Sequence, residues 1–285
     1  VSFVMAVGLF LSAYLTSSVA LQLQSAYRQL AAALAEMSNR EEAKSLFMRT
    51  MAHQLRSPLA AITTLIDALS LGGGRDDAKL TEVHGRIKAR AASMMELVDD
   101  LLRLAQIREG AVKQDPAEPI EAWALFAEIV ASFEETAAHR PVRLTVELPG
   151  EPVMVLAAKR DLRDLLGNLI SNAIKYNRPG GTVTVCGELD RDVLVTEVID
   201  TGIGIPAEDQ KQLVTEFFRA SNARKQAAHS SGLGLSIGKE IVDRLGGRIT
   251  FTSTEGEGTT FRFELPVVGA TCSIAEHEGG VGGAG

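Results

Sequence analysis

Apolar residues recur in alternating steps of four and three along much of the first seventy residues. The run from Leu23 to Met37 resumes in the same register between Met48 and Leu69, after an interruption by polar Glu41 and Lys44. This repeat is typical of a helix that buries one narrow stripe against a partner helix. The beginning of the chain is therefore predicted to be a long helical rod.

A second helix is predicted after the glycines at 72–74. Its apolar stripe runs from Leu80 to Leu101. Two antiparallel helices joined by a short loop leave part of their apolar surface uncovered, and a second copy of the chain would cover it in a dimeric four-helix bundle. A monomeric hairpin that packs on the following domain is the alternative.

Residues 1–21 contain no charged side chain. About 20 such residues cross the ~30 Å hydrocarbon layer of a bilayer as a helix. Basic residues follow at Arg28, Arg40 and Lys44, which predicts a single or last transmembrane helix in the inner (cytoplasmic) membrane with the rest of the chain in the cytoplasm. A signal peptide is the alternative, but the segment lacks a basic start and a small-residue cleavage site.

His53 is predicted to lie on the helix face opposite the apolar stripe. Met51 and Leu55 belong to the stripe, so the intervening histidine points away from it. Pro58 lies in the helix interior, where it cannot donate to the carbonyl of Gln54 and is expected to bend the rod. An exposed imidazole one turn from a bend is a candidate functional group beside a two-state element.

The pattern changes after residue 115 from long helices to mixed elements. Apolar residues repeat at helical spacing over 162–174, and strands are predicted at 142–148, 182–187, 193–200, 248–253 and 260–265. Helices that flank one mixed or antiparallel sheet form an α/β sandwich. The predicted fold class of the whole chain is α+β.

Two asparagines one helical turn apart form the first chemical motif. Asn168 and Asn172 share one side of the predicted helix and can present neutral oxygens together. Mg²⁺ that carries phosphate oxygens and water accepts such ligands. Two polar surface residues would give the same pattern, so the motif alone is weak.

Two glycine-rich motifs follow. Asp200 ends an apolar strand and can accept a hydrogen bond from an amino group such as that of adenine, while Gly202 and Gly204 allow close approach to a flat ring. Gly232 and Gly234 open a helix whose backbone N–H groups can bind phosphate. Their spacing matches neither a Walker loop nor a dinucleotide-binding fingerprint.

Composition narrows the function classes. The formal charge is −7, which argues against non-specific nucleic-acid binding and predicts no nucleic-acid partner. The two cysteines, Cys186 and Cys272, form no disulfide framework and fit a reducing compartment.

Taken in order, these motifs resemble the sensor histidine kinases of two-component systems. The string at 52–59 (AHQLRSPL) is similar to a dimerisation and phosphoacceptor domain. The asparagine pair, the Asp-Gly loop, 216–219 (EFFR), the Gly-Leu-Gly helix and 256–261 (GEGTTF) resemble the ATP-binding domain shared by histidine kinases, gyrase-type ATPases and heat-shock chaperones.

This resemblance implies five segments along the chain. A transmembrane helix at 1–21 precedes a coiled-coil signalling helix at 22–43. A dimerisation and histidine phosphotransfer domain at 44–110 and an ATPase domain at 116–268 follow, and 269–285 would be a disordered tail. The chain is then expected to form a homodimer at the membrane.

The resemblance also implies a reaction. His53 takes the γ-phosphoryl group of Mg-ATP and passes it to an aspartate on the receiver domain of a response regulator. By position, Asn172 becomes the principal Mg²⁺ ligand with Asn168 beside it. Lys175 would contact phosphate, and Arg219 would approach the γ-phosphate.

The resemblance also implies an adenine site in the same domain. Tyr176 would lie near the adenine, and Asp200 would recognise its amino group. The remaining nucleotide-binding residues implied by the resemblance are Gly202, Gly204, Ile205, Gly232, Leu233, Gly234, Leu235 and Thr260.

Two positions depart from the pattern of the family. Gln54 stands where most relatives have an acidic residue, and its amide oxygen could orient the imidazole of His53 without accepting a proton. General-base assistance is worth about 10²–10⁴-fold, so reduced rather than abolished phosphorylation is expected. The resemblance does not imply that dephosphorylation of the partner, which in the family also involves the position of Ser57, is retained. Ser230 replaces a common glycine at the end of an expected lid, 207–231.

Two other functions remain open from the sequence. A non-catalytic dimeric scaffold that binds ATP would be compatible with Gln54 and Ser230. A gyrase-like ATP hydrolase would place a glutamate where Asn168 stands, and the chain lacks it.

Overall fold

The computed structural model describes residues 2–71, 77–109, 116–226 and 231–268, although the side chains of some helical residues, most of them before residue 46, are outside this description. The chain divides into two compact units, residues 1–71 and 72–285. The predicted tail at 269–285 and Ser230 lie outside the described residues.

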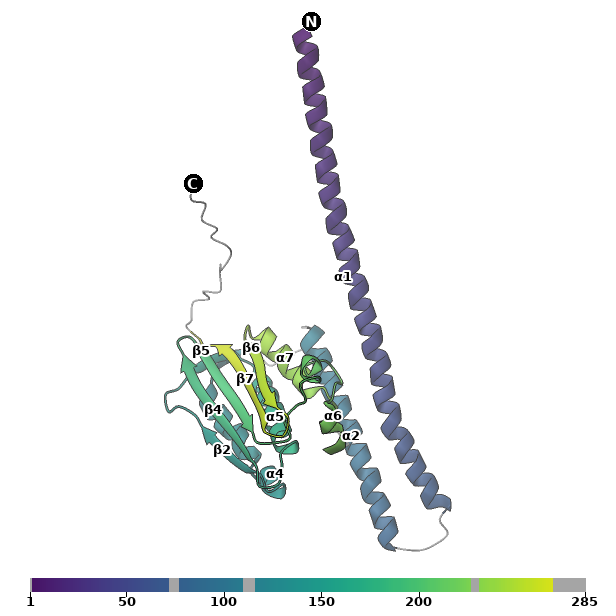
Figure 1. Ribbon diagram of the computed structural model, residues 1–285, viewed down its shortest axis with the longest axis vertical. Coiled ribbons are helices and arrows are strands. Elements are labelled where there is room, and N and C mark those ends of the chain that lie inside the picture. Colours follow the sequence, from purple (N-terminus) through teal and green to yellow (C-terminus); the bar gives the residue numbers. More distant parts are fainter. Residues whose placement is uncertain (1, 72–76, 110–115, 227–230, 269–285) are drawn as a thin grey trace. The chain divides into compact units, whose positions relative to one another are not determined.

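The first unit is one continuous helix, α1 (Ser2–Leu71), with Pro58 in its interior (Figure 1). The predicted helical rod is therefore confirmed. Large apolar side chains of the predicted stripe are exposed on the single chain, as expected for a surface that a partner helix covers. They include Tyr27, Leu30, Leu34, Met37 and Met48.

No helix in the searched part of the chain has a stretch both long and apolar enough to cross a bilayer. The side chains of the predicted membrane helix, residues 1–21, lie outside the described residues.

The second unit begins with the predicted second helix, α2 (Asp77–Glu109), which contacts α7 (Gly234–Arg244). Toward the end of α2, Leu104 is fully buried and Ile107 nearly so. The glycine connection at 72–74 lies outside the described residues.

A mixed five-stranded sheet forms the centre of the second unit, as the sequence predicted (Figure 1). The first two strands in the spatial order are parallel and all the other neighbours are antiparallel. The order is β2 (Arg143–Glu147), β4 (Thr182–Asp190), β5 (Val193–Asp200), β7 (Gly258–Pro266) and β6 (Arg248–Thr254).

A separate two-stranded sheet was not predicted. It pairs β1 (Glu118–Glu121) with β3 (Met154–Ala157) in antiparallel register. Both strands have only four residues, which is too short to give a clear alternation in the sequence. The side chain of Glu121 accepts hydrogen bonds from the backbone N–H groups of Trp123 and Ala124 and so caps the start of α3 (Ala122–Ser132).

Three helices, α3, α5 (Lys159–Lys175) and α7, pack with the sheet and enclose the core. The predicted apolar spacing of α5 is confirmed, because its leucines and isoleucines are almost completely buried. Trp123 and Phe126 of α3 stack edge to face, and Phe126 meets Phe263 of the sheet in the same way, with ring centroids 5.8 and 5.9 Å apart.

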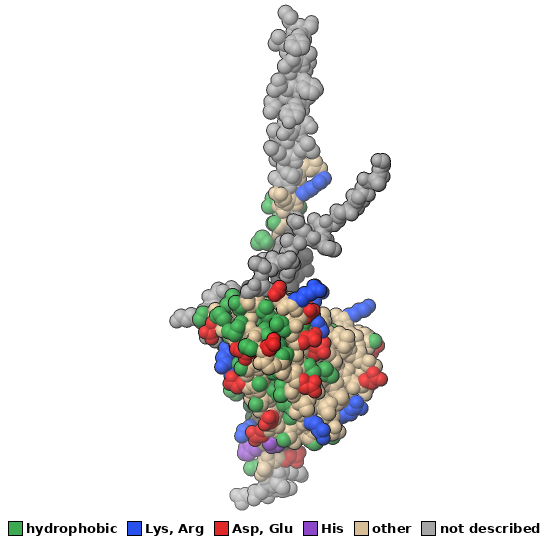
Figure 2. Space-filling model, turned by 90° about the vertical axis from the view of Figure 1, so that its left-hand side faces the viewer, with side chains coloured by type: hydrophobic (Ala, Val, Ile, Leu, Met, Phe, Trp, Pro, Cys, Tyr) green, Lys and Arg blue, Asp and Glu red, His purple; other side chains and the backbone are tan. Residues whose placement is uncertain are grey.

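The remaining elements are short. The helix α4 (Glu134–His139) contacts β2, and the connection between β5 and α7 contains the 3-10 turn η1 (Gln210–Gln212) and the helix α6 (Ser221–Gln226). On the face shown in Figure 2, acidic and basic side chains are scattered among uncharged ones rather than gathered by sign.

A buried charge cluster joins α2 to α5 and α7. The Arg103 guanidinium donates to Asp161 and to Asp164, each at 2.5 Å, and Arg244 of α7 forms an ion pair with the same Asp161. Arg103 and Asp161 are only 9% and 5% exposed. Removing one partner of such a pair leaves an uncompensated buried charge, which typically costs about 3–5 kcal/mol.

Two Leu→Ala substitutions at positions of different burial are predicted to change the free energy of unfolding by different amounts. Leu166→Ala removes a side chain with no exposed surface and is expected to lower the free energy of unfolding by about 2–5 kcal/mol. Leu156→Ala, at a position that is 57% exposed, is expected to change it by about 0.5 kcal/mol. Urea denaturation of both variants measures the difference, and equal losses would contradict the assignment of the core.

Candidate functional site

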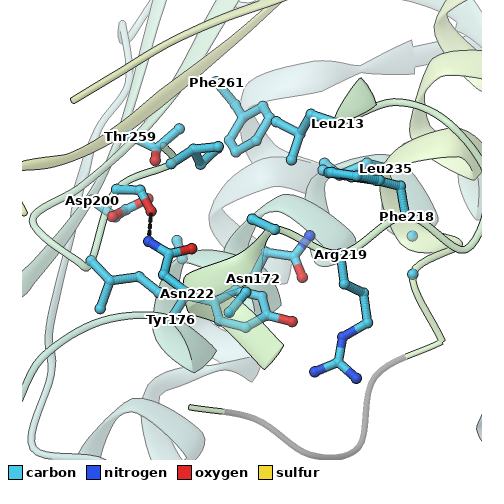
Figure 3. Close-up of a pocket in the computed structure, with 18 residues that line it drawn as sticks. Asn172, Tyr176, Asp200, Leu213, Phe218, Arg219, Asn222, Leu235, Thr259 and Phe261 are labelled. Atoms are coloured by element: carbon cyan, nitrogen blue, oxygen red, sulfur yellow. Dashed lines mark hydrogen bonds between the residues drawn. The ribbon is translucent and has the colours of Figure 1, made fainter. Parts of the chain in front are cut away.

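A cavity of about 750 Å³, part of it open to solvent, lies beside the carboxyl end of β5 (Figure 3). Its lining comes from α5, the loop after β5, the connection to α7, the start of α7, and β7. The site is therefore assembled from segments that are far apart in the sequence.

Most of the cavity wall is apolar. Ile203 and Ile205 come from the loop after β5, Leu213 and Phe218 come from the connection that follows, and Phe261 comes from β7. Such a wall suits a flat, weakly polar ring, and a few polar groups around it would set the orientation of the ring.

Asp200 is the acidic group of this cavity. It ends β5, and its Oδ1 accepts a hydrogen bond from the backbone N–H of Gly202 at 2.8 Å. Burial raises the pKa of Asp200 to about 6, although hydrogen bonds from the backbone of Gly202 and Thr259 act in the opposite direction. Near neutral pH the carboxyl group is therefore mostly an ionised acceptor held at a cost in stability.

The loop after Asp200 requires glycine at two positions. A Cβ atom on Gly202 would lie 2.4 Å from the carbonyl oxygen of Tyr176. Gly204 has a φ of +61°, and a Cβ there would lie 1.9 Å from the carbonyl oxygen of Thr254. Any side chain at either position would push the loop away from its neighbours and change the cavity wall.

Basic groups gather near the end of α5. Burial lowers the pKa of Lys175, and the guanidiniums of Arg219 and Arg140 lower it further. Two carboxylates of α2, those of Glu96 and Asp100, act in the opposite direction on the same ammonium group. The surroundings of the Lys175 ammonium group thus contain guanidiniums as well as carboxylates.

The segment before α7 is tied to its surroundings by side-chain hydrogen bonds. Ser231 donates to Asp100 of α2 at 2.5 Å, and its hydroxyl oxygen accepts from the backbone N–H of Leu233 at 3.2 Å. Asn168 donates to the carbonyl oxygen of Gly234 at 3.3 Å. The glycines of this segment are thus held beside α5.

The cavity brings together most of the residues that the sequence singled out. Those that line it are Asn172, Tyr176, Asp200, Gly204, Ile205, Arg219, Gly232, Gly234 and Leu235. Lys175, Gly202 and Leu233 lie next to lining residues in the chain but are not part of the lining, and Leu233 is fully buried. Asn168 is also outside the lining, one helical turn before Asn172, and it bonds to the lining residue Gly234.

Thr260 was predicted to contact the ligand, whereas the lining residues of β7 are Thr259 and Phe261. Side chains alternate along a strand, so the residue between these two faces away from the cavity. The alternation of β7 in the sequence could have identified the correct pair. Leu213 and Asn222 both belong to the expected lid at 207–231, but no motif within it singled out either residue.

His53 and Gln54 belong to the other unit of the chain. Both are exposed on α1, while the stripe residues Met51 and Leu55 are half-buried, as the heptad assignment predicted. His53 is therefore accessible to a reaction partner.

Asn172 lines the cavity and can supply a neutral amide oxygen to a hard cation. Within the described ranges, no group of three or more His, Cys, Asp or Glu side chains could hold a metal ion. The donor set therefore fits Mg²⁺ only in company with oxygens that a bound phosphate and water would provide.

Two family models match the chain. The model for the histidine kinase-, DNA gyrase B- and HSP90-like ATPase matches residues 157–269, which include the cavity. The model for the His kinase A (phospho-acceptor) domain matches residues 43–110, which include His53.

Among curated proteins, the chain is 31% identical over 233 residues to the sensor histidine kinase WalK of Bacillus subtilis, covering 81% of this chain and 38% of WalK. It is equally 31% identical to the adaptive-response sensory kinase SasA of Prochlorococcus marinus, covering 81% of this chain and 60% of that protein. The chain thus spans less than two thirds of the length of each of these relatives.

Among solved structures, the histidine kinase ThkA in its complex with the response regulator protein TrrA has a TM-score of 0.62 at 22% identity, covering 77% of this chain and 60% of that one. The Acinetobacter baumannii histidine kinase AdeS has a TM-score of 0.59 at 21% identity, covering 76% and 98%. At this level of identity the likeness concerns the fold alone.

The raised pKa of Asp200 predicts that replacing this residue by a neutral one increases the free energy of unfolding, and that the increase depends on pH. The folded pKa of about 6 exceeds the ordinary value of 3.8, so the stability that protonation of Asp200 provides is lost as pH rises through 6. Asp200→Asn is therefore expected to raise the free energy of unfolding by about 1–3 kcal/mol at pH 8, with a smaller gain at pH 5.

Denaturation curves at both pH values measure this gain, and Asp190→Asn at an exposed position serves as the control. A stability gain for Asp200→Asn that does not change with pH would contradict the assigned cost of the buried carboxylate.

Proposed function

Because this chain belongs to the histidine kinases of two-component systems, we propose that it transfers the γ-phosphoryl group of ATP to His53 and then to an aspartate of a response regulator. One observation carries the proposal. The chain combines an exposed histidine inside a phospho-acceptor match with a cavity inside an ATPase match.

In the proposed complex, the adenine ring lies in the apolar part of the cavity. The carboxylate of Asp200 accepts a hydrogen bond from the adenine amino group, and the glycine loop that follows keeps the wall thin enough for the ring to enter. The aromatic ring of Tyr176, at the end of α5, packs near the base.

The triphosphate lies toward the basic end of the cavity. Lys175 and Arg219 attract it by charge, and the backbone N–H groups after Gly232 donate to its oxygens. Asn172 would hold Mg²⁺ through its amide oxygen. When bound, this ion neutralises part of the charge that develops on the transferred phosphoryl group.

The chemical step forms an N–P bond and breaks the bond between the γ-phosphorus and the β–γ bridging oxygen. The ring nitrogen of His53 that carries no proton supplies the electron pair, and ADP leaves with the bridging oxygen. The phosphorylated ring then releases the proton of its other nitrogen to solvent. Gln54 accepts a hydrogen bond from the other ring nitrogen and fixes the orientation of the imidazole. In the second step the phosphoryl group moves from nitrogen to a carboxylate oxygen of the receiver domain.

Two kinds of protein partner are proposed. A receiver domain is the expected phosphoryl acceptor, and the solved complex of ThkA with TrrA is an example from a protein of similar fold. A second copy of the chain would cover the exposed stripe of α1, which includes Leu30 and Leu34.

We also propose that residues 1–21 anchor the chain in the inner (cytoplasmic) membrane, with the catalytic domains in the cytoplasm. The support is the uncharged composition of this segment and the basic residues that follow it.

A labelling experiment tests the proposed reaction. Incubation with Mg²⁺ and γ-³²P-ATP is expected to give an acid-labile, base-stable phosphoprotein that His53→Ala abolishes. His84→Ala, at an exposed histidine of α2, is the matched control and should label like the wild type. Asn172→Ala should also abolish labelling while leaving the oligomeric state unchanged.

Two results would contradict the proposal. Labelling that survives His53→Ala would exclude this acceptor, and ATP binding without any labelling would favour a non-catalytic scaffold. Continuous phosphate release without a phosphoprotein would instead indicate an ATP hydrolase.

A separate substitution tests the role of Gln54. A carboxylate there could accept the ring proton as well as orient the ring, so Gln54→Glu is expected to phosphorylate His53 at an equal or higher rate. Any gain should lie at the low end of the about 10²–10⁴-fold range of general-base assistance. Initial rates of labelling measure the effect. A large loss of rate would show that Gln54 does not act as an orienting substitute for an acidic residue.

A further inference from the structure

Asn222 is held over the glycine loop of the cavity. It belongs to α6, and its side-chain Nδ2 donates to the carbonyl oxygen of Gly204 at 2.9 Å. The preceding residue, Ser221, donates from both its backbone N–H and its hydroxyl to Asp209, each at 2.7 Å. These bonds fix the position of Asn222 against the segment that follows Asp200.

The amide oxygen of Asn222 has no hydrogen-bond partner among the described residues, although it is shielded from solvent. A buried acceptor without a donor is unfavourable, and native proteins rarely leave one without a reason. The amide cannot satisfy it by turning over, because the bond from Nδ2 to Gly204 would then be lost. The site therefore has an acceptor that lacks a donor.

Asn222 and Asp200 both line the same cavity, and Figure 3 shows the Asn222 amide in the region between Asp200 and Tyr176. Asp200 already accepts from the backbone with one of its oxygens. The cavity thus presents acceptors from two different segments, one at the end of β5 and one in α6.

We propose that Asn222 is a specificity-determining residue, whose amide oxygen accepts the second hydrogen of the adenine amino group while Asp200 accepts the first. This inference rests on the proposed binding of ATP in this cavity. An exocyclic amino group carries two donors, so it matches two acceptors. A guanine ring presents a carbonyl oxygen at the equivalent position, which would face both acceptors unpaired.

Since the amide oxygen is shielded, the entering base must slightly displace Asn222 or the side chains that cover it before the bond can form. Asn222 would then join the base to α6, while its Nδ2 stays bonded to Gly204. Recognition of the base and the position of α6 would be coupled through one side chain.

The experiment compares the affinities of the full chain for ATP and for purine riboside triphosphate, which lacks only the amino group. The affinity ratio of the two nucleotides isolates the contribution of that group. Asn222→Ala and Asn222→Leu are expected to lower this ratio by about 3- to 10-fold, the value of one neutral hydrogen bond. Preference for ATP should persist in both variants because Asp200 remains.

Gln212→Ala is the matched control, since it removes an exposed amide from the same connection and should leave the ratio unchanged. The leucine variant keeps most of the side-chain volume. If both Asn222 variants change the affinity ratio equally, the cavity that alanine leaves is not the cause of the change. Thermal denaturation verifies that each variant is folded.

Equal weakening of both nucleotides, or an unchanged ratio, in the Asn222 variants would overturn the proposal. Failure of the proposed function gives a different result. If the wild type binds ATP but never labels His53, the kinase assignment fails while the affinity ratios still decide the role of Asn222. If the wild type binds neither nucleotide, both proposals fail.

Discussion

The burial of one face of α5 against the sheet determines the position of almost everything in the cavity. Its leucines and isoleucines are excluded from water, so the helix can neither slide nor rotate without exposing them. Asn172 and Tyr176 lie at the end of this fixed helix, and Asn168 on the same helix bonds to Gly234 at the start of α7. The hydrophobic effect in this way positions groups that are themselves polar.

Burial stabilises α5, whereas it is unfavourable for the carboxylate of Asp200. Its register opposite Thr259, at the end of the pairing between β5 and β7, places a carboxyl group where burial raises its pKa. The fold tolerates this cost because the backbone N–H of Gly202 partly compensates it. Functional sites often retain such unfavourable groups, since a ligand donor can use an acceptor that the protein itself leaves incompletely satisfied.

The sequence predicted the elements whose periodicity is strong. The apolar face of α5 and the alternation of the strands of the large sheet are present in the structure because burial imposes the same periods. The heptads of the first seventy residues correctly predicted the helix α1, although stripe residues such as Leu30 and Leu34 are exposed on the single chain. The sheet of β1 and β3 could not be predicted, since four-residue strands contain too few alternations and their pairing joins distant segments.

The site was predictable to the extent that its residues form local motifs. The Asp-Gly loop and the glycines before α7 can be identified from their spacing in the sequence. Leu213 and Asn222 lie in an irregular connection, and only the path of that connection in the fold brings them to the cavity. Thr259 and Thr260 differ merely in the face of β7 that they occupy, and a motif that includes both cannot distinguish them.

The ion pairs of α2 differ in their exposure to dissolved salt. Arg103 and Asp161 are nearly inaccessible to counterions, which therefore screen their attraction weakly. Arg108, near the end of the helix, pairs with Glu216 and Glu240 while 42% of its side chain remains exposed. A rise in ionic strength would thus loosen the last turn of α2 from its neighbours first and leave the turn that carries Arg103 anchored.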